Sequence, residues 1–398
     1  MKILFVCHRF PYPPARGGKI RPFNIIRHLA NRADVTVASL WRSAEELQAG
    51  EGLARYCQRI VAEPIGQWAA NLRMVARLPT FAPSSFGNFH SPALAARIRG
   101  ELATGDYDLV FVHCSSVAPY VVHHRGCPMV LDFGDMDSEK WAMYSAERQF
   151  PLSLGYGLEA IKLRRVEREL ARRFDLSTCT TAAEHDTLVA LGSARRTGWF
   201  PNGVDTEYFA PAPAETDPDL ICFAGRMDYF PNQQAVQRFC DNAFDRIRAA
   251  RPATRLVIVG AEPPPAIVAL GQRPGIRVTG TVPDVRPEVR RAAVSVAPLD
   301  VARGTQNKIL ESMAMGVPVV CTPLAARGVD AVPGEHLLTG DSPANMAVAV
   351  LSLLDDPARR LAYATRARER VLSHHSWAGS MRRLDGLLGA CTRRADGA

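Results

Sequence analysis

At 398 residues the chain is too long for one hydrophobic core of ordinary size, so we expect two domains of about 150–200 residues each. The apolar fraction of 47% predicts a folded, soluble protein, and no apolar run reaches the roughly 18 residues of a membrane-spanning helix. Nine scattered cysteines without a C-x-x-C pair argue against disulfides or zinc and favour a reducing cytoplasm. The net charge of +8 admits nucleic acid, an anionic membrane or a phosphate-bearing ligand without choosing among them.

The first half of the sequence alternates strand and helix signals. A Pro/Gly-rich loop at 8–18 leads into a helix near 19–31, and apolar runs predict strands at 2–7, 34–40, 108–114 and 128–133. The run KILFVC at the start is too short for a signal-peptide core and is typical of a strand. This alternation predicts right-handed βαβ units and a parallel, Rossmann-like sheet.

A long helix is expected at 152–174, followed by a short strand at 174–181 and a Pro/Gly/Asp-rich connection at 198–219. Its apolar residues are spaced for one buried face and its remainder is basic; the apolar positions are Leu158, Ile161, Val166, Leu170 and Phe174.

A second βαβ series starts at 220–225, so a second Rossmann-like domain is predicted. Two or three amphipathic helices are expected over 343–389, and the last can cross back to the first domain. The remaining expected elements are strands at 256–260, 276–280, 294–299 and 317–322 and helices near 232–250, 263–272, 284–292 and 305–315.

Residues 294–321 carry the strongest chemical signal. A helix entered through Gly304 and Thr305 offers backbone N–H groups and a positive dipole end to an anion such as a diphosphate. Lys308 and Glu311 lie three residues apart on one helix face, where they can serve a nucleotide or form a surface ion pair.

Glycine and arginine at other strand ends extend this signal. Gly225 and Arg226 follow the strand at 220–225, and an arginine there gives a planar fork for phosphate. Gly17 and Gly18 can admit a phosphate or form a plain turn. The G-x-G-x-x-G spacing of nicotinamide-dinucleotide enzymes is absent after the first strand.

Acidic and histidine residues mark the strand ends of the first half. Asp135 and Asp137 form a D-x-D that could hold a metal, although N-capping of the next helix by Asp135, Asp137 or Ser138 is the favoured interpretation. Asp135 remains a catalytic candidate because sheet-end loops line ligand clefts. His113 shares that edge and is a candidate, and His8 is a weaker one.

Taken in order, these motifs resemble a retaining glycosyltransferase of the GT-B fold, family four. The C-terminal block GTQNKILESMAMGVPVV at 304–320 is the most specific part, and PNGVDTEYF at 201–209 and FAGRM at 223–227 agree with it. FPYPPARGGKIRPFN and DSEKW resemble the subgroup of sugar transferases that accompanies exopolysaccharide and PEP-CTERM sorting systems.

The resemblance implies an α/β protein with two facing Rossmann-like domains, a cleft between them and a C-terminal helix that returns to the first domain. The implied boundaries are 1–197, 198–375 and 376–398. It implies that Arg226 and Lys308 hold the donor diphosphate and Glu311 the ribose.

Further roles follow from the same resemblance. Gly225, Gly304 and Thr305 would face phosphate, with Gly17 and Gly18 approaching it from the other domain. Thr281 and Val282 would face the base, and His113 would contact the transferred sugar. No metal or cofactor is expected, because fixed cations replace a metal.

The sequence departs from the family pattern at two places, and these departures affect the predicted sugar contacts more than the predicted nucleotide contacts. Arg303 stands where a first glutamate is usual, and the lysine common after Gly-Arg is missing, a charge that Lys308 can replace.

The predicted function is retaining transfer of a hexosyl group from a nucleotide-diphosphate sugar to a glycan or lipid-linked acceptor in exopolysaccharide biosynthesis. A nucleotide-sugar epimerase of the same architecture and a non-catalytic assembly scaffold are the alternatives. No nucleic-acid partner is expected.

We expect the protein in the cytoplasm, at the inner face of the membrane if peripheral contact occurs. Membrane contact is suggested by the basic face at 162–173 and by Trp68, Leu72 and Val75 beside Arg73 and Arg77. A solvated helix is the competing interpretation.

Overall fold

A computed structural model describes residues 1–14, 17–212 and 216–392. The chain divides into two compact units: unit 1 comprises Met1–Pro201 with Met381–Ala398, and unit 2 comprises Asn202–Ser380. Each unit is built on its own parallel sheet, which confirms the prediction of two Rossmann-like domains. Across the described residues, no helix combines the length and the apolar character needed to cross a membrane.

Unit 1 contains a seven-stranded sheet in the order β3-β2-β1-β4-β5-β6-β7, with parallel pairing throughout. The strands are β1 (Lys2–Cys7), β2 (Asp34–Trp41), β3 (Arg59–Pro64), β4 (Leu109–His113), β5 (Met129–Gly134), β6 (Leu176–Cys179) and β7 (Thr197–Trp199). The helices are α1 (Gly17–Leu29), α2 (Ala44–Gln48), α3 (Gln67–Arg77), α4 (Pro92–Thr104), α5 (Asp137–Glu147), α6 (Leu152–Arg173) and α7 (Ala182–Ala190). Three 3-10 helices lie at Ala49–Arg55, Ser85–Phe89 and Ser115–Tyr120.

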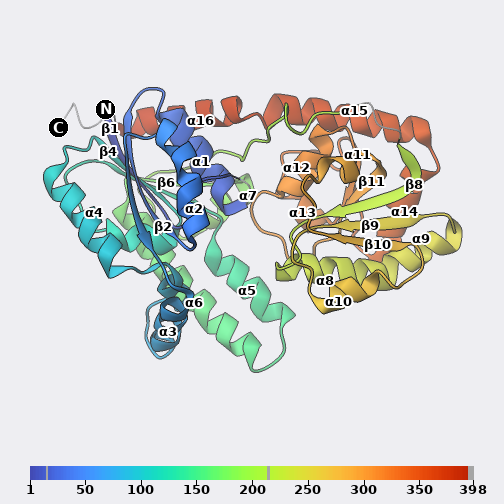
Figure 1. Cartoon of the computed structure of the whole chain (residues 1–398), viewed down its shortest axis with the longest axis horizontal. Coiled ribbons are helices and arrows are strands. Elements are labelled where there is room, and N and C mark those ends of the chain that lie inside the picture. The colour runs from blue at the N-terminus through green and yellow to red at the C-terminus, as the bar shows by residue number, and fades with distance from the viewer. Residues whose placement is uncertain (15–16, 213–215, 393–398) are drawn as a thin grey trace. The chain divides into compact units, whose positions relative to one another are not determined.

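Both faces of this sheet are covered, as burial of a parallel sheet requires (Figure 1). Leu4 and Val6 point into a core that includes Leu94 and Ile98 of α4. Helix α1 lies on the other side of the strands. For this reason β1 and β4 are apolar on both faces apart from Lys2 and His113 at their ends, and they form continuous apolar runs in the sequence.

Unit 2 contains a six-stranded sheet in the order β10-β9-β8-β11-β12-β13, again with parallel pairing. Its strands are β8 (Asp217–Ala224), β9 (Arg255–Val259), β10 (Ile276–Gly280), β11 (Ala292–Ala297), β12 (Val319–Cys321) and β13 (Leu338–Thr339). Its helices are α8 (Phe230–Arg238), α9 (Asp245–Ala250), α10 (Pro265–Leu270), α11 (Arg286–Arg290), α12 (Asn307–Ala314), α13 (Pro323–Ala326), α14 (Pro343–Leu354) and α15 (Pro357–His374). The helix expected near 232–250 is interrupted by a π-helical turn at Phe239–Phe244.

The last helix, α16 (Trp377–Thr392), begins in unit 2 and ends in unit 1. Within unit 1, His28 Nε2 lies 2.8 Å from Asp385 Oδ1, and the Arg383 guanidinium lies 3.8 Å from the centre of the Trp199 ring. A Cβ atom on Gly198 would lie 2.5 Å from the Leu387 side chain, so β7 and α16 pack closely. The expected return of the C-terminal helix to the first domain is confirmed.

Helix α6 departs from its predicted packing. Leu170 and Phe174 are buried, as expected, but Leu158 and Ile161 are 52% and 69% exposed. The buried side of the first half of α6 is formed by Glu159, Ala160 and Leu163. The single buried face predicted for 152–174 is therefore wrong for its first half.

The ends of β8 and β9 meet so closely that one position admits only glycine. A Cβ atom on Gly260 would lie 1.8 Å from the Gly225 carbonyl oxygen. We predict that Gly260→Ala lowers the free energy of unfolding by about 2 kcal/mol or more, because backbone must move to relieve the overlap. Urea unfolding measures the change.

Gly100→Ala is the matched control, because Gly100 lies inside α4 and a Cβ atom added there would have nothing within 4 Å. It is expected to raise the free energy of unfolding by about 0.5–1 kcal/mol, as alanine favours helix interiors. Equal effects of the two substitutions would contradict the assigned overlap.

Candidate functional site

Each sheet has one point where the strand order reverses, and ligands of open α/β sheets bind beyond the carboxyl ends of the strands there. In unit 2 this point lies between β8 and β11, and in unit 1 between β1 and β4. The predicted residues Gly225 and Arg226 directly follow β8, and His113 ends β4. Sheet topology therefore defines one candidate site in each unit.

In unit 2, Gly225 lies against the tip of Lys308. A Cβ atom on Gly225 would lie 3.0 Å from Lys308 Nζ and 2.9 Å from Asn232 Nδ2. Lys308 Nζ donates to Asn232 Oδ1 at 2.5 Å and lies 4.5 Å from the centre of the Phe223 ring. Asn232 Nδ2 in turn donates to the Arg226 carbonyl oxygen at 2.7 Å. The β8 end and α12 thus position one ammonium group beside the Gly225 backbone.

Burial shifts both ionisable groups of α12. It lowers the pKa of Lys308 to about 7, an effect that the charge of Glu311 partly opposes. It raises the pKa of Glu311 to about 7, again partly opposed by its partner. Among the described residues, Lys308 forms no ion pair within 4 Å, so the surface ion pair considered from sequence is not what the structure contains. An anion bound beside Lys308 would favour its charged form.

Arg226 is held by two carboxylates. It donates from Nε to Asp228 Oδ1 at 2.9 Å and from Nη2 to Asp228 Oδ2 and Glu262 Oε2, both at 2.8 Å. The bond from Arg226 lowers the pKa of Asp228. Glu262 has a φ of 58°, the left-handed region that costs a non-glycine residue free energy. Loops after β8 and β9 therefore fix the guanidinium at the strand ends.

The loop before α12 is longer than expected. The helix begins at Asn307, so Gly304 and Thr305 precede it instead of forming its first turn. Gly304 has a φ of 63°, and its carbonyl oxygen lies 2.4 Å from where a Cβ atom on Gly328 would stand. Thr305 Oγ1 is buried without a hydrogen-bond partner among the described residues. This loop is held by close backbone packing.

The residues predicted to face the base follow β10. Thr281 is exposed, and Val282 packs against the apolar cluster that contains Cys222 and Val259. Within the described part of the chain, no hydrogen bond joins Thr281 or Val282 to Lys308, and their role remains a prediction.

In unit 1, a buried carboxylate organises the site. Asp132 of β5 accepts from His113 Nδ1 at 2.7 Å and from Arg21 Nε and Nη2, both at 2.8 Å. Thr178 Oγ1 donates to the same carboxylate at 2.9 Å. Burial alone would raise the pKa of Asp132, but Arg21 and His113 lower it well below its usual range. The bond at Nδ1 fixes the orientation of the His113 ring.

His8 and Gly18 lie next to this network. The His8 and His113 rings are 5.7 Å apart, and a Cβ atom on Gly18 would lie 3.8 Å from His8 Nε2. Burial, with His113 and nearby cations, lowers the pKa of His8 well below its ordinary value. Gly17 begins α1, so the structure brings the predicted glycine pair and His113 together at one sheet edge.

Asp135 directly follows β5, at the strand end where the sequence predicted it. It accepts from Thr180 Oγ1 at 2.8 Å, while Asp132 contacts His113. The predicted capping of α5 by Asp135, Asp137 or Ser138 is wrong: the N-cap residue is Met136, without a side-chain cap. Glutamates from other helices accept the amides at this helix start, with Met136 N 2.7 Å from Glu184 Oε2 and Ser138 N 3.0 Å from Glu167 Oε1.

Sequence reasoning missed Asp132, Arg21 and Asn232. Asp132 carried a usable signal, because an aspartate inside an apolar, fully buried strand needs a partner. Arg21 and Asn232 carried no such signal, because each lies in an ordinary helical stretch. Only their contacts with residues far away in the sequence, Asp132 and Lys308, place them in the sites.

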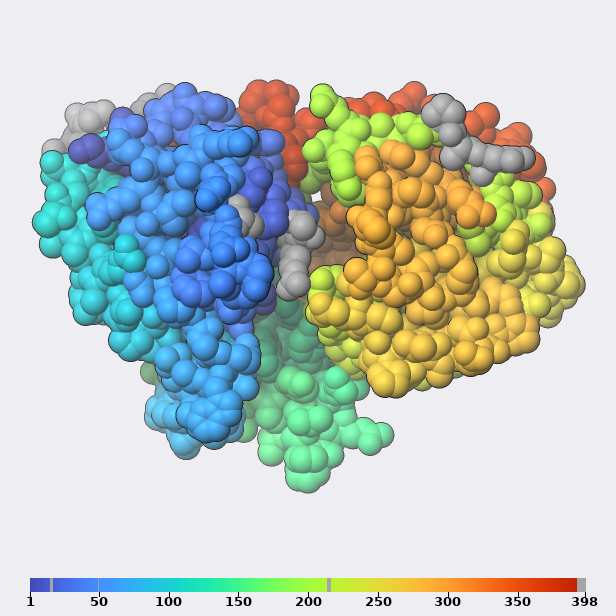
Figure 2. All heavy atoms as spheres, in the orientation of Figure 1, coloured from blue at the N-terminus to red at the C-terminus, as the bar shows by residue number. Residues whose placement is uncertain are grey.

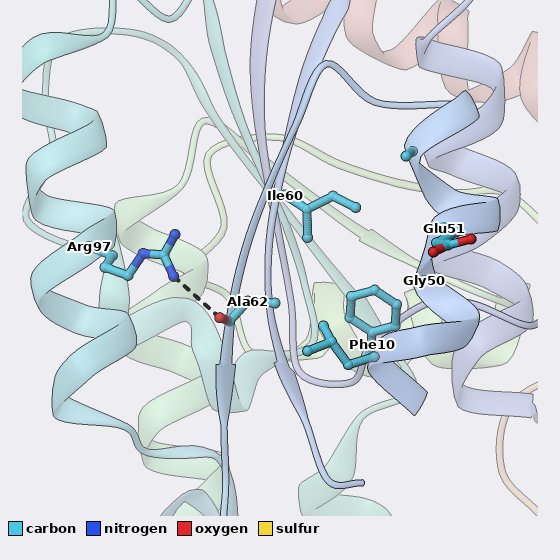
Figure 3. Close-up of a pocket in the computed structure, with 8 residues that line it drawn as sticks. Phe10, Gly50, Glu51, Ile60, Ala62 and Arg97 are labelled. Carbon is cyan, nitrogen blue, oxygen red and sulfur yellow. Dashed lines mark hydrogen bonds between the residues drawn. The ribbon is translucent and has the colours of Figure 1, made fainter. Parts of the chain in front are cut away.

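A separate hollow of about 380 Å³ lies beside the edge strand β3 (Figure 3). Phe10 and Ile60 line it, and Arg97 Nη1 donates to the Ala62 carbonyl oxygen at its margin, 3.3 Å away. It contains none of the predicted site residues. Within the described part of the chain, no three His, Cys, Asp or Glu side chains are grouped to hold a metal ion.

Comparison with known protein families defines the class. Residues 15–208 match the model described as Glycosyltransferase Family 4, and residues 218–356 match Glycosyl transferases group 1. Both halves of the chain are thus glycosyltransferase domains, and the protein is a glycosyltransferase.

Two curated relatives carry names of the same class. Phosphatidyl-myo-inositol mannosyltransferase of Mycolicibacterium smegmatis is 27% identical over 298 residues, covering 70% of each chain. D-inositol 3-phosphate glycosyltransferase 1 of Catenulispora acidiphila is 28% identical over 316 residues, covering 72% of each.

Solved structures share the GT-B fold, which confirms the fold prediction. Sucrose-phosphate synthase from Thermosynechococcus elongatus superposes with a TM-score of 0.70 at 16% identity, over 98% of both chains. HepE of Anabaena in complex with UDP gives 0.68 at 15% identity, over 98% of this chain and 100% of that one.

We predict that Asp132→Asn lowers the free energy of unfolding by about 3 kcal/mol or more, because it leaves the buried Arg21 guanidinium without its counter-charge. Urea denaturation at pH 7 measures the loss. Asp135→Asn serves as control and is expected to change the same quantity by no more than about 1 kcal/mol. A mild effect at Asp132 would contradict the buried ion pair.

The pH dependence of stability tests the environment of α12. The pKa of Lys308 falls from 10.5 to about 7 on folding, so its destabilising effect is complete below pH 7 and fades as the pH rises towards 10.5. The pKa of Glu311 rises from 4.5 to about 7, so its effect is absent below pH 4.5 and complete above pH 7. The two effects overlap most near pH 7.

We therefore predict that the double variant Lys308→Met/Glu311→Gln is more stable than the unliganded wild type, with the largest gain near pH 7. Denaturant unfolding from pH 5 to 9 measures this difference, in which the titration of all other groups cancels. A gain that does not vary with pH would show that neither pKa is shifted.

Proposed function

We propose that unit 2 binds the diphosphate of a nucleotide-sugar donor beyond the ends of β8 and β11. The observation that carries this is the Lys308 ammonium, which lies beside Gly225 and forms no ion pair within 4 Å among the described residues. Gly225, Gly304 and Thr305 line the diphosphate, Arg226 and Lys308 supply its positive charge, and Glu311 accepts from the ribose hydroxyls. Thr281 and Val282 face the base.

The names of the compared proteins support this donor class. HepE structures contain UDP, and further ones contain UDP with glucose or UDP-glucose. The curated relatives are named for mannosyl and glycosyl transfer. A nucleoside-diphosphate hexose is therefore the donor that we propose for this chain.

In the proposed reaction, charge accumulates on the leaving diphosphate, and Arg226 and Lys308 stabilise it in the transition state. These fixed cations take the place of a metal ion, and no cofactor takes part. Transfer proceeds with retention by attack on the face from which the diphosphate leaves, so the carboxylate-pair geometry of glycosidases does not apply.

The groups of unit 1 serve the sugar and the acceptor in this proposal. His113 contacts the transferred sugar, with its ring held by Asp132, and Gly17 and Gly18 admit the diphosphate from the start of α1. Asp135 remains a catalytic candidate on the acceptor side. Resemblance to the PEP-CTERM-associated subgroup supports a glycan or lipid-linked acceptor in exopolysaccharide synthesis, at the cytoplasmic face of a membrane.

A thermal-shift titration with UDP and nucleotide-diphosphate sugars tests donor binding, since a ligand stabilises the fold in proportion to its affinity and concentration. Lys308→Ala is expected to weaken donor binding at least about tenfold while the variant stays folded. Arg359→Ala, an exposed change on α15 of the same unit, is the control and should bind as wild type. Wild-type affinity in Lys308→Ala would overturn the assigned site.

Products separate the alternatives. A transferase consumes donor when acceptor is present, and NMR of the product reads the anomeric configuration that retention preserves. Conversion of the UDP-sugar alone to its epimer would instead identify an epimerase. Donor binding without any turnover would favour a scaffold.

A further inference from the structure

Exposed apolar side chains of unit 1 gather in two short segments. Among the described residues, twenty large apolar side chains are exposed, and ten of them lie within residues 68–81 and 150–161. They are Trp68, Leu72, Val75, Leu78 and Phe81 in the first segment and Phe150, Leu152, Leu154, Leu158 and Ile161 in the second. Scattered single exposures need no explanation, but concentration of this kind marks an interaction surface.

The first segment is an amphipathic helix whose apolar face is uncovered. Helix α3 buries only Ala70. Trp68, Leu72 and Val75 follow at i, i+4 and i+7, so they form one stripe, and their exposed fractions are 78%, 53% and 62%. Packing within the chain does not account for this stripe.

The second segment repeats the pattern on α6. Leu154, Leu158 and Ile161 again stand at i, i+4 and i+7, on the side opposite the buried Leu163. The same helix therefore uses one face for the core and exposes a second apolar face. This is the part of α6 that the sequence pattern had assigned to the core.

Direct contacts fasten the two segments together. Lys162 Nζ donates to the Arg77 and Leu78 carbonyl oxygens at 3.2 and 2.9 Å, and the Arg165 guanidinium lies 5.6 Å from the centre of the Phe81 ring. In Figure 2, the α3 region (blue) and the α5–α6 hairpin (green) both project from unit 1. Trp68, Leu72, Val75, Leu78, Phe81, Leu154, Leu158 and Ile161 together are called the α3–α6 surface.

Positive charge surrounds these apolar residues. Residues 67–85 contain Arg73 and Arg77 and no acidic residue. Lys162, Arg164 and Arg165 follow the α6 stripe, whereas the nearest acidic groups of α6, Glu159 and Glu167, are buried. Glu159 accepts from the Ser84 and Ser85 amides at 2.9 and 2.8 Å, so it is turned away from solvent.

We propose that the α3–α6 surface docks on an anionic membrane. Tryptophan and aliphatic side chains enter the boundary between headgroups and acyl chains, while the exposed Arg164 and Arg165 contact anionic headgroups. A second copy of this chain fits less well, because it would set this basic surface against an identical one. Docking would bring a lipid-linked acceptor to unit 1, and this part of the proposal rests on the proposed function.

Vesicle flotation tests this directly with the full-length protein. We expect co-flotation with phosphatidylcholine vesicles containing 30 mol% phosphatidylglycerol at low salt, and at least tenfold weaker partitioning into pure phosphatidylcholine. Trp68→Ser/Leu72→Ser and Leu158→Ser/Ile161→Ser should each lower the partition coefficient at least tenfold. Arg164→Glu/Arg165→Glu should weaken binding to the anionic vesicles alone.

The matched control is Val348→Ser/Leu361→Ser, two apolar residues of unit 2 that are 65% and 68% exposed and should leave partitioning unchanged. A blue shift of tryptophan emission on adding vesicles, lost in Trp68→Phe while flotation persists, would place Trp68 in the interface. UDP-induced thermal stabilisation, read on the same variants, reports unit 2 separately, so loss of docking and loss of donor binding are distinguishable.

Failure of the wild type to float with anionic vesicles at low salt would overturn the inference. Concentration-dependent dimerisation abolished by the same serine variants, without flotation, would reassign the surface to self-association and would overturn it as well. Equal loss of flotation in the unit 2 control would show that binding is not specific to the α3–α6 surface.

Discussion

The desolvation of charged side chains at the ends of the two parallel sheets is the constraint on which both candidate sites depend. In unit 1, Asp132 is fully buried, but Arg21, His113 and Thr178 satisfy its oxygens. In unit 2, Lys308 has an amide oxygen and an aromatic face for partners, and its pKa falls accordingly. The buried charge of unit 1 is therefore balanced without a ligand, whereas an anion bound in unit 2 would stabilise the charged form of Lys308.

This difference supports the different tasks that we propose for the two units. A satisfied carboxylate holds a histidine ring in one orientation, which suits recognition of an uncharged sugar or acceptor. A cation beside the Gly225 backbone that forms no ion pair within 4 Å among the described residues suits a diphosphate. Arg226 differs from Lys308 in being fixed by Asp228 and Glu262, so its position is set before any donor arrives. The membrane proposal concerns a third region, where apolar side chains remain exposed because no other element covers them.

Much of the fold could be predicted because burial on both faces gives parallel strands long apolar runs. The predicted strands at 2–7, 108–114 and 276–280 agree with β1, β4 and β10 to within a residue at each end. The edge strands β3 and β7 carry weaker apolar patterns, and the sequence did not predict them. Helix α6 shows the limit of periodicity: spacing identifies an apolar stripe but not whether another element covers it.

By itself, the sequence determined the two βαβ series, the glycines and cations at their strand ends, and the family resemblance, because strand periodicity and local motifs are properties of neighbouring residues. Only the tertiary structure decided that Asp132 and not Asp135 holds His113, that Asn232 receives Lys308, and that the α5 amides are capped by Glu184 and Glu167. Each of these contacts joins residues at least 19 positions apart. Their chemistry depends on burial and distance, which no local pattern encodes.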